Sequence, residues 1–188
     1  YGQRMKKKVA IIDHLGAHGS SHHFYLFGQA KGLIDNNVNV SLYTNSATID
    51  PKIIDLHFFQ FYKNIFSRNN KLLSLFRYLF GSLYSHFHAR LNSCNIFHYH
   101  LFGSSLLVIF NMIIAKFLLV KIVLTIHDVQ SFSKKNKSSF YSKIIYLFSD
   151  VILTHNQFSK QEMILNQPFL KNKIEIVPHG NYIPFVNI

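Results

Sequence analysis

The feature that most constrains the fold of this chain is a strand, a glycine loop and a helix that follow one another near its start. Residues 9–12 are a short apolar run rich in β-branched side chains, and a polar loop containing Gly16 and Gly19 follows it. Apolar residues in the segment 24–34 then recur at helical spacing. A buried strand, a glycine-bearing turn and a helix are typical of the opening of a doubly wound α/β unit.

The glycine loop has two interpretations. Ser20 and Ser21 can cap the helix, whose first turn has free N–H groups that favour an anion. The G-x-x-G spacing is shorter than the G-x-G-x-x-G of dinucleotide sites and specifies a phosphate site weakly. A tight turn that needs positive φ explains Gly16 equally well.

The alternation of strand and helix patterns continues along the chain. Further strands are predicted at 38–43, 53–59, 95–100, 121–126, 150–154 and 173–177, with 53–59 at an edge. Further helices are predicted at 66–91, 104–119, 141–148 and 159–165. Such alternation implies βαβ units with right-handed crossovers. We therefore predict an α/β fold with a doubly wound, mostly parallel, Rossmann-like sheet of about six or seven strands, because each βαβ unit adds one parallel strand. One domain covers residues 1–188, and residues 1–4 lie outside its core.

Composition limits the partners and the compartment. The 188 residues are 48% hydrophobic, enough for one full core. Twenty Lys and Arg against eight Asp and Glu give a formal charge of +12, which indicates an anionic partner: nucleic acid, an acidic membrane surface or a phosphorylated substrate. A single cysteine, Cys94, excludes a disulfide framework and a thiolate metal cluster, and fits a reducing cytoplasm. The segment 104–126 is apolar but interrupted by Asn111, Lys116 and Lys121, so we expect no spanning helix there.

The segment 66–91 is predicted to be an amphipathic helix. Its apolar stripe is formed by Leu72, Phe76, Leu79, Leu83 and Phe87. The favoured interpretation is a surface helix packed on the sheet. The alternative is a basic, aromatic-rich helix that rests on an anionic membrane surface.

Many of the histidines lie where the predicted strands end. The residues at these ends are Asp13, His14, His18, His98, His100, His127, Asp128, His155, Asn156, His179 and Gly180. The carboxyl ends of parallel strands share one edge of the sheet, and ligands of such sheets bind there. A concentration of titratable groups at this edge predicts a functional site.

Two chemistries compete at this edge. His100, His127 and Asp128 could ligate zinc or iron, since imidazole and carboxylate suit these metals. The same histidines could instead donate hydrogen bonds to sugar hydroxyls and phosphates. Spacing alone specifies a metal weakly, so we favour the second interpretation and expect no metal.

Four motifs, in order, suggest a family. They are GAHGSS at 16–21, KIVLTIHD at 121–128, DVILTHNQFSK at 150–160 and KIEIVPHG at 173–180. With these motifs the chain resembles the N-terminal domain of GT-B-fold glycosyltransferases, specifically glycosyltransferase family 4, over about residues 6–182. The resemblance implies that this domain receives the acceptor, and that a second Rossmann-like domain, absent from residues 1–188, binds the nucleotide-sugar donor.

The resemblance also implies an activity. The expected enzyme is a hexosyltransferase, acting with retention, that uses a nucleotide-sugar as co-substrate and needs no other cofactor. The domain is expected to be inactive alone. The predicted partners are the nucleotide-sugar, a saccharide or glycolipid acceptor of envelope polysaccharide synthesis and an anionic membrane surface, but not nucleic acid. The predicted location is the cytoplasm, peripheral on the inner face of the membrane.

The strand-end residues and the resemblance together give a predicted site. The predicted catalytic residues are His127 and Asp128. The predicted substrate-binding residues are Gly16, His18, Gly19, Ser20, His100, His155, His179 and Gly180. Many relatives have serine at the position of His155. Two other functions stay open at this point: a basic nucleic-acid-binding module, and a metal-dependent hydrolase that uses the histidine-rich edge.

Overall fold

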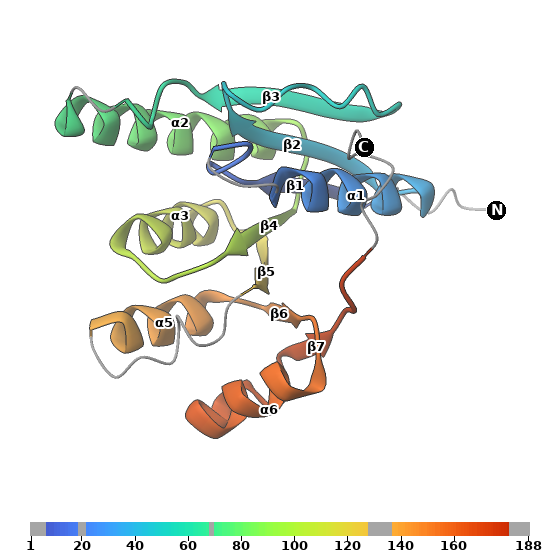
Figure 1. Cartoon of the computed structure of the whole chain (residues 1–188), viewed down its shortest axis with the longest axis vertical. Helices are drawn as coiled ribbons and strands as arrows, with labels where there is room; N and C mark the ends of the chain where they lie inside the picture. The colour runs from blue at the N-terminus through green and yellow to red at the C-terminus, as the bar shows by residue number, and fades with distance from the viewer. Residues whose placement is uncertain (1–6, 19–21, 68–69, 128–136, 181–188) are drawn as a thin grey trace. The chain divides into compact units, whose positions relative to one another are not determined.

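The part of the chain that the structure describes has an α/β fold with seven strands (Figure 1). The computed structural model describes residues 7–18, 22–67, 70–127 and 137–180. It divides into two compact units, which are described separately: residues 1–95 with 180–188, and residues 96–179.

The first unit contains three parallel strands in the order β3-β2-β1. Its elements are β1 (Lys8–Ile12), α1 (His22–Asp35), β2 (Asn39–Asn45), β3 (Leu56–Tyr62) and α2 (Lys71–Leu91). Helix α1 packs against β2, and α2 packs against β3. The carboxyl ends of these strands therefore lie at one edge of this part of the sheet.

The second unit contains four parallel strands in the order β4-β5-β6-β7. Its elements are β4 (Ile96–Leu101), α3 (Leu106–Phe117), β5 (Lys121–Ile126), α5 (Lys137–Phe148), β6 (Val151–Thr154), α6 (Gln157–Asn166), the 3₁₀ turn η1 (Pro168–Leu170) and β7 (Ile174–Ile176). Helices α3 and α5 pack side by side, and α6 packs against β6 and β7.

The local sequence explains these elements. Strand residues such as Ile11, Leu42 and Leu124 are fully buried, as expected of parallel strands covered on both faces. Helices begin at side-chain caps: the Asn70 side chain accepts a hydrogen bond from the Leu73 N–H, and the Asn156 side chain accepts one from the Ser159 N–H. The predicted Rossmann-like α/β architecture is confirmed.

The third strand lies three residues later than predicted. The strand predicted from the sequence covers residues 53–59, whereas β3 is Leu56–Tyr62. Lys52 and Asp55 have positive φ, +55° and +66°, so the backbone turns there, and Ile54 is left exposed. The edge position is correct, since within the described part of the chain β3 pairs only with β2.

The favoured packing of α2 on the sheet is confirmed, but the face that packs is not the apolar stripe. Leu72 and Phe76 of the stripe are 62% and 50% exposed. The buried face consists instead of Tyr78, Gly81, Ser82, Ser85, His86 and Ala89. Gly81 explains this choice of face, because a Cβ at this position would lie 2.9 Å from Tyr62 Cδ1 and 3.1 Å from the Phe61 carbonyl oxygen. The helix approaches β3 too closely for larger side chains on that face.

The segment 104–126 folds as α3 and β5, in agreement with the expectation that it does not span a membrane. Within the described residues, every helix is too short or too polar to cross a bilayer.

Candidate functional site

The loop after β1 is held by the carboxylate of Asp13. Asp13 is buried, and it accepts hydrogen bonds from the Gly16 N–H at 2.6 Å and from the Leu15 N–H at 3.3 Å. The Gly16 N–H is therefore used in a hydrogen bond within the loop in this structure. Burial alone would raise the pKa of Asp13, but the neighbouring His22 and His14 and the Gly16 N–H hold it below its usual value.

Gly16 needs to be glycine for the shape of this loop. Its φ is +48°, and a Cβ there would lie 1.9 Å from Thr48 Oγ1. The expectation that Gly16 forms a positive-φ turn is confirmed. The Thr48 hydroxyl also accepts a hydrogen bond from the Ala17 N–H at 3.0 Å, so the residues after β2 fix the loop after β1.

A cavity of about 510 Å³ opens at the carboxyl ends of the first unit's strands. Its lining is formed by His18, Asn45, Ser46, Ala47, Tyr62, Asn64, Ile65, Phe66, Ser67 and Arg77. The exposed ring of His18 stacks on Phe66, with 3.7 Å between centroids and 3° between planes. Arg77 of α2 donates to the Asn64 carbonyl at 3.2 Å. The cavity thus combines an aromatic platform, amides, hydroxyls and one cation.

A row of histidines follows the strand ends of the second unit. His98 is buried, and its Nε2 lies 2.8 Å from the Thr125 hydroxyl on β5. Burial lowers the pKa of His98 to about 4, so it is neutral at physiological pH. The His98 ring stacks on that of His100, as their shared side of β4 predicts.

His127, just after β5, is held on several sides. Its backbone N–H donates to the Leu101 carbonyl at 3.1 Å, and its Nε2 lies 3.0 Å from His100 Nδ1. Its ring also stacks on Phe102, with centroids 4.6 Å apart. His127 is therefore positioned by the end of the neighbouring strand β4.

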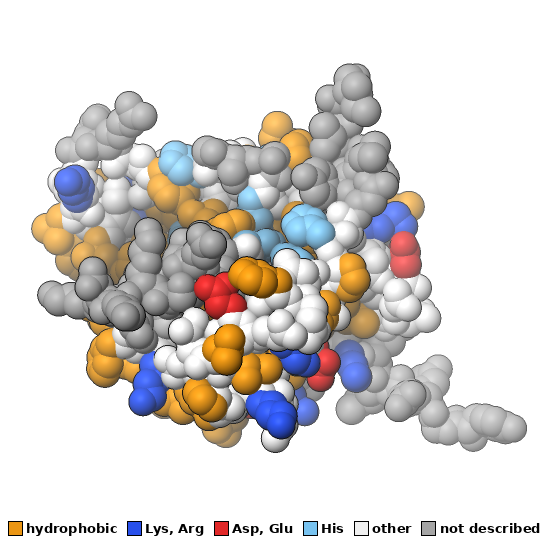
Figure 2. All heavy atoms as spheres, turned by 60° about the horizontal axis from the view of Figure 1, so that its bottom comes forward, with side chains coloured by type: hydrophobic (Ala, Val, Ile, Leu, Met, Phe, Trp, Pro, Cys, Tyr) orange, Lys and Arg blue, Asp and Glu red, His pale blue; other side chains and the backbone are white. Residues whose placement is uncertain are grey.

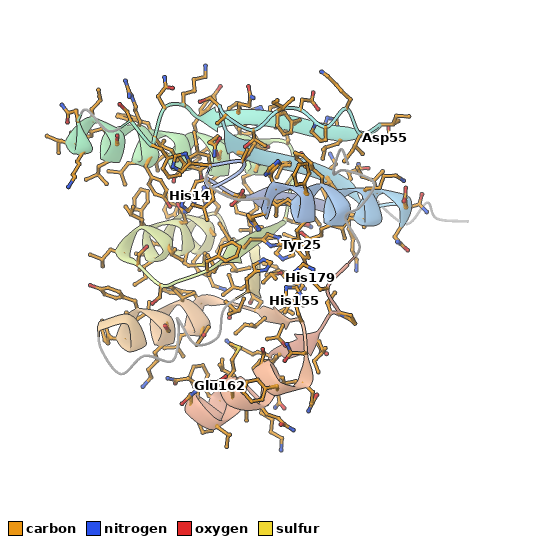
Figure 3. All side chains as sticks on the ribbon, in the orientation of Figure 1. His14, Tyr25, Asp55, His155, Glu162 and His179 are labelled. Atoms are coloured by element: carbon orange, nitrogen blue, oxygen red, sulfur yellow. The ribbon has the colours of Figure 1, made fainter. Side chains whose placement is uncertain are left out.

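His155 and His179 complete the row, side by side after β6 and β7 (Figure 3). His155 Nδ1 lies 3.0 Å from the Val177 carbonyl oxygen, and its Nε2 lies 3.4 Å from His127 Nδ1. Burial lowers the pKa of His155, and the nearby His179 lowers it further. Several histidine side chains also gather on the face seen in Figure 2.

The predicted residues fall into four groups. His100, His127, His155 and His179 form one cluster, and Gly16 and His18 lie at the loop of the first unit. Gly180 is exposed with open space around it. Asp128, Gly19 and Ser20 lie outside the described residues.

Sequence reasoning missed Thr48, Phe66 and Arg77. Thr48 follows the second strand and so lies at the same edge as the strand-end residues named from the sequence. The residues considered at strand ends include none that follows the second strand. The contacts of Phe66 and Arg77 with the cavity depend on tertiary packing.

The sequence profile of glycosyltransferase family 4 matches residues 23–181. The chain belongs to glycosyltransferase family 4. The match covers most of the chain and agrees with the order of motifs quoted above. No curated protein matches the chain in sequence.

Solved structures share the fold of this family 4 domain. MurG of Acinetobacter baumannii superposes with a TM-score of 0.59 at 13% identity, covering 93% of this chain and 46% of MurG. The lipopolysaccharide outer core galactosyltransferase WaaB gives 0.60 at 14% identity, covering 91% and 45%. UDP-GlcNAc 2-epimerase of Methanocaldococcus jannaschii, solved with UDP-GlcNAc and UDP, gives 0.59 at 14%, covering 90% and 46%. The chain therefore spans about half the length of the structures it matches.

Proposed function

We propose that this family 4 chain is the acceptor-side domain of a glycosyltransferase. The enzyme transfers a hexosyl group, with retention, from a nucleotide-sugar to a polysaccharide or lipid-linked acceptor of the cell envelope. The observation that carries the proposal is the family match over residues 23–181. The rigid cluster around His127 at the strand ends supports it. The domain is inactive without its donor-binding partner domain.

His127 is proposed to act on the reacting sugar. Glycosyl transfer passes through an oxocarbenium-like state while a diphosphate leaves with negative charge. A positioned imidazole can donate to a sugar hydroxyl or stabilise the developing positive charge, which lowers the barrier because no reorganisation is needed. The contacts from Leu101, His100 and Phe102 supply that positioning. The proposed reaction needs no cofactor or metal.

The cavity of the first unit is proposed to bind the acceptor saccharide. Its amide and hydroxyl groups match sugar hydroxyls, and the stacked His18 and Phe66 offer a flat face. Arg77 provides a positive charge for an anionic group of the acceptor.

Helix α2 is proposed to rest on an anionic membrane surface at the inner face of the membrane. Its outward side exposes Leu72, Phe76 and Phe80, the last by 69%. Residues 71–91 contain no Asp or Glu, whereas Lys71 and Arg77 are basic. An apolar face flanked by positive charge is complementary to an anionic lipid surface. We infer that the net charge of +12 attracts anionic lipid and the diphosphate of the donor rather than nucleic acid.

The proposed activity is tested with His127→Ala in the full-length enzyme. We expect turnover to fall about a hundredfold or more, the scale of losing one positioned donor, while the thermal midpoint changes little. His57→Ala is the matched control, because His57 is exposed on β3 and outside the cluster. A folded His127→Ala enzyme that transfers sugar at the parental rate would exclude His127 from the mechanism.

A further inference from the structure

Three histidines at the strand ends of the second unit bring one ring nitrogen each close together. His127, His155 and His179 each offer one ligand atom, and these atoms all lie within 4.8 Å of one another. His127 Nδ1 and His155 Nε2 are 3.4 Å apart. In a tetrahedral site with Zn–N bonds of about 2.0–2.1 Å, ligand nitrogens are about 3.3 Å apart. Two of the three nitrogens thus already have the spacing of ligands to one ion.

Outer partners orient these two rings for ligation. The Val177 carbonyl can only accept a hydrogen bond, so His155 Nδ1, 3.0 Å away, donates to it, and His155 Nε2 keeps its lone pair. His127 Nε2 faces His100 Nδ1 at 3.0 Å, which leaves His127 Nδ1 on the side of His155. Metal-bound histidines typically have such a partner on the second ring nitrogen, which fixes the tautomer.

The third histidine can complete the set with a small movement. His179 is exposed, and its ring centroid lies 4.5 Å from that of His155 and 6.3 Å from that of His127. Rotation of an exposed side chain can bring its nitrogen to bonding distance at little cost. Among the described residues the group offers imidazoles and no carboxylate, a donor set that suits zinc and its neighbours and not Mg²⁺ or Ca²⁺.

We propose that His127, His155 and His179 bind a divalent transition-metal ion, Zn²⁺ above all, through three imidazole nitrogens. Water completes the coordination, as in zinc sites with three protein ligands. This set differs from the one considered in the sequence, since His100 supports His127 from outside and does not ligate. The site goes beyond the proposed function but shares His127 with it: the ion takes no part in the sugar transfer, and the transfer role of His127 belongs to the metal-free protein. Its test therefore uses no sugar.

The test measures metal binding by the tag-free chain after treatment with a chelator. Titration calorimetry should find one Zn²⁺ per chain, and Co²⁺ should give the visible absorption of a low-coordinate site. A large excess of Mg²⁺ should not compete. His155→Ala and His179→Ala should each weaken Zn²⁺ binding by more than about 100-fold, because loss of an outer partner alone costs about 10–100-fold. His100→Ala should fall in that outer-partner range.

The matched control is His57→Ala, which removes an exposed histidine on β3 and should leave the Zn²⁺ affinity unchanged. His179 is exposed, so His179→Ala keeps the test decisive even if His155→Ala unfolds. The proposal is overturned if the chain binds no Zn²⁺, or if His179→Ala binds it with unchanged affinity. Failure of this site would leave the transfer proposal standing, because neither measurement depends on the other.

Discussion

At the scale of single residues, His98 shows how burial restricts titration in the histidine row. The imidazole lies inside the second unit, 2.8 Å from the Thr125 hydroxyl, and burial lowers its pKa to about 4. In the unfolded chain the same side chain has a pKa of about 6.5. Below pH 6.5 the unfolded state therefore binds a proton that the folded state does not bind until pH falls to about 4.

This difference predicts a loss of stability in mild acid. Between pH 7 and pH 5 the free energy of unfolding should fall by about 2 kcal/mol through His98 alone. Urea unfolding at the two pH values measures the change. His98→Asn retains a neutral hydrogen-bonding group that does not titrate. The free energy of unfolding of this variant should therefore fall by about 2 kcal/mol less than that of the parent between pH 7 and pH 5. Equal pH dependence in the two proteins would contradict the assignment.

At the scale of elements, the face of α2 that allows a close approach to β3 is the face that is buried. Its buried face carries Ser85 and His86, whose polar atoms reach helix carbonyls: Ser85 Oγ donates to the Gly81 carbonyl, and His86 Nδ1 lies 2.6 Å from the Ser82 carbonyl oxygen. These hydrogen bonds reduce the cost of burying polar groups. The close approach at Gly81 thus determines which face of the helix is buried, and the apolar stripe is left exposed.

A pair of glycine substitutions tests this. Gly81→Ala gains helix propensity of about 1 kcal/mol, but its Cβ would lie 2.9 Å from Tyr62 and 3.1 Å from a backbone oxygen. Overpacking costs about 1–3 kcal/mol, so we expect a net loss in the free energy of unfolding. Gly32→Ala, in α1 with nothing within 4 Å, should instead stabilise by about 0.5–1 kcal/mol. Chemical denaturation measures both, and a gain from Gly81→Ala would rule out the close approach as the cause.

The strands could be predicted because apolar, β-branched runs are local signals. The exception is the start of β3, where Ile53 and Ile54 look like strand residues but the positive φ of Lys52 and Asp55 turns the chain. Hydrophobicity gives no sign of that turn. The face of α2 could not be predicted either, because the contact between Gly81 and Tyr62 is tertiary.

The candidate site was predictable to the extent that it depends on topology. Parallel strands bring their carboxyl ends together, so His100, His127, His155 and His179 meet without any motif being needed. The order of the row follows the strand order β4-β5-β6-β7, whereas the contacts between neighbouring rings depend on side-chain rotamers and could not be predicted. The cavity residue Arg77 lies on a helix, and the rule that residues after parallel strands meet at one edge makes no prediction about helix residues.

At the scale of the whole molecule, charge and exposed apolar area act together. The chain has a formal charge of +12, and the outward side of α2 is apolar with basic neighbours. An apolar groove of about 720 Å³ along this side is lined by Phe61, Lys63, Leu73, Phe76, Arg77, Phe80, Gly81 and Tyr84. Both contributions favour an anionic lipid surface.

Vesicle sedimentation tests the membrane contact. The chain should sediment with vesicles that contain anionic lipid and be released by salt, which screens the attraction. Lys71→Ser with Arg77→Ser should weaken binding roughly 30-fold, since each basic residue near such a surface contributes about 1 kcal/mol. Phe76→Ser with Phe80→Ser should also release the protein.

The control pair for this experiment is Phe117→Ser with Lys121→Ser. Both residues are exposed in the second unit, and Phe117 is 76% exposed, so the pair removes the same residue types from another surface. Vesicle binding should be unchanged in the control. If the α2 variants bind as tightly as the parent chain, the helix does not contact the lipid.

The loop at Gly16 has a consequence for the evolution of this sequence. Every amino acid reachable from a glycine codon by one nucleotide change carries a Cβ, and at this position that atom would collide with Thr48. A smaller residue at position 48 would not be enough, because Thr44 Oγ1 and Asn45 Nδ2 would lie 2.6 and 2.8 Å from the same Cβ. Positive φ also penalises the new side chain. A Cβ at Gly103 would meet no atom within 4 Å, so substitutions at this position meet no such steric clash. The two loops should diverge at different rates among descendants of this gene.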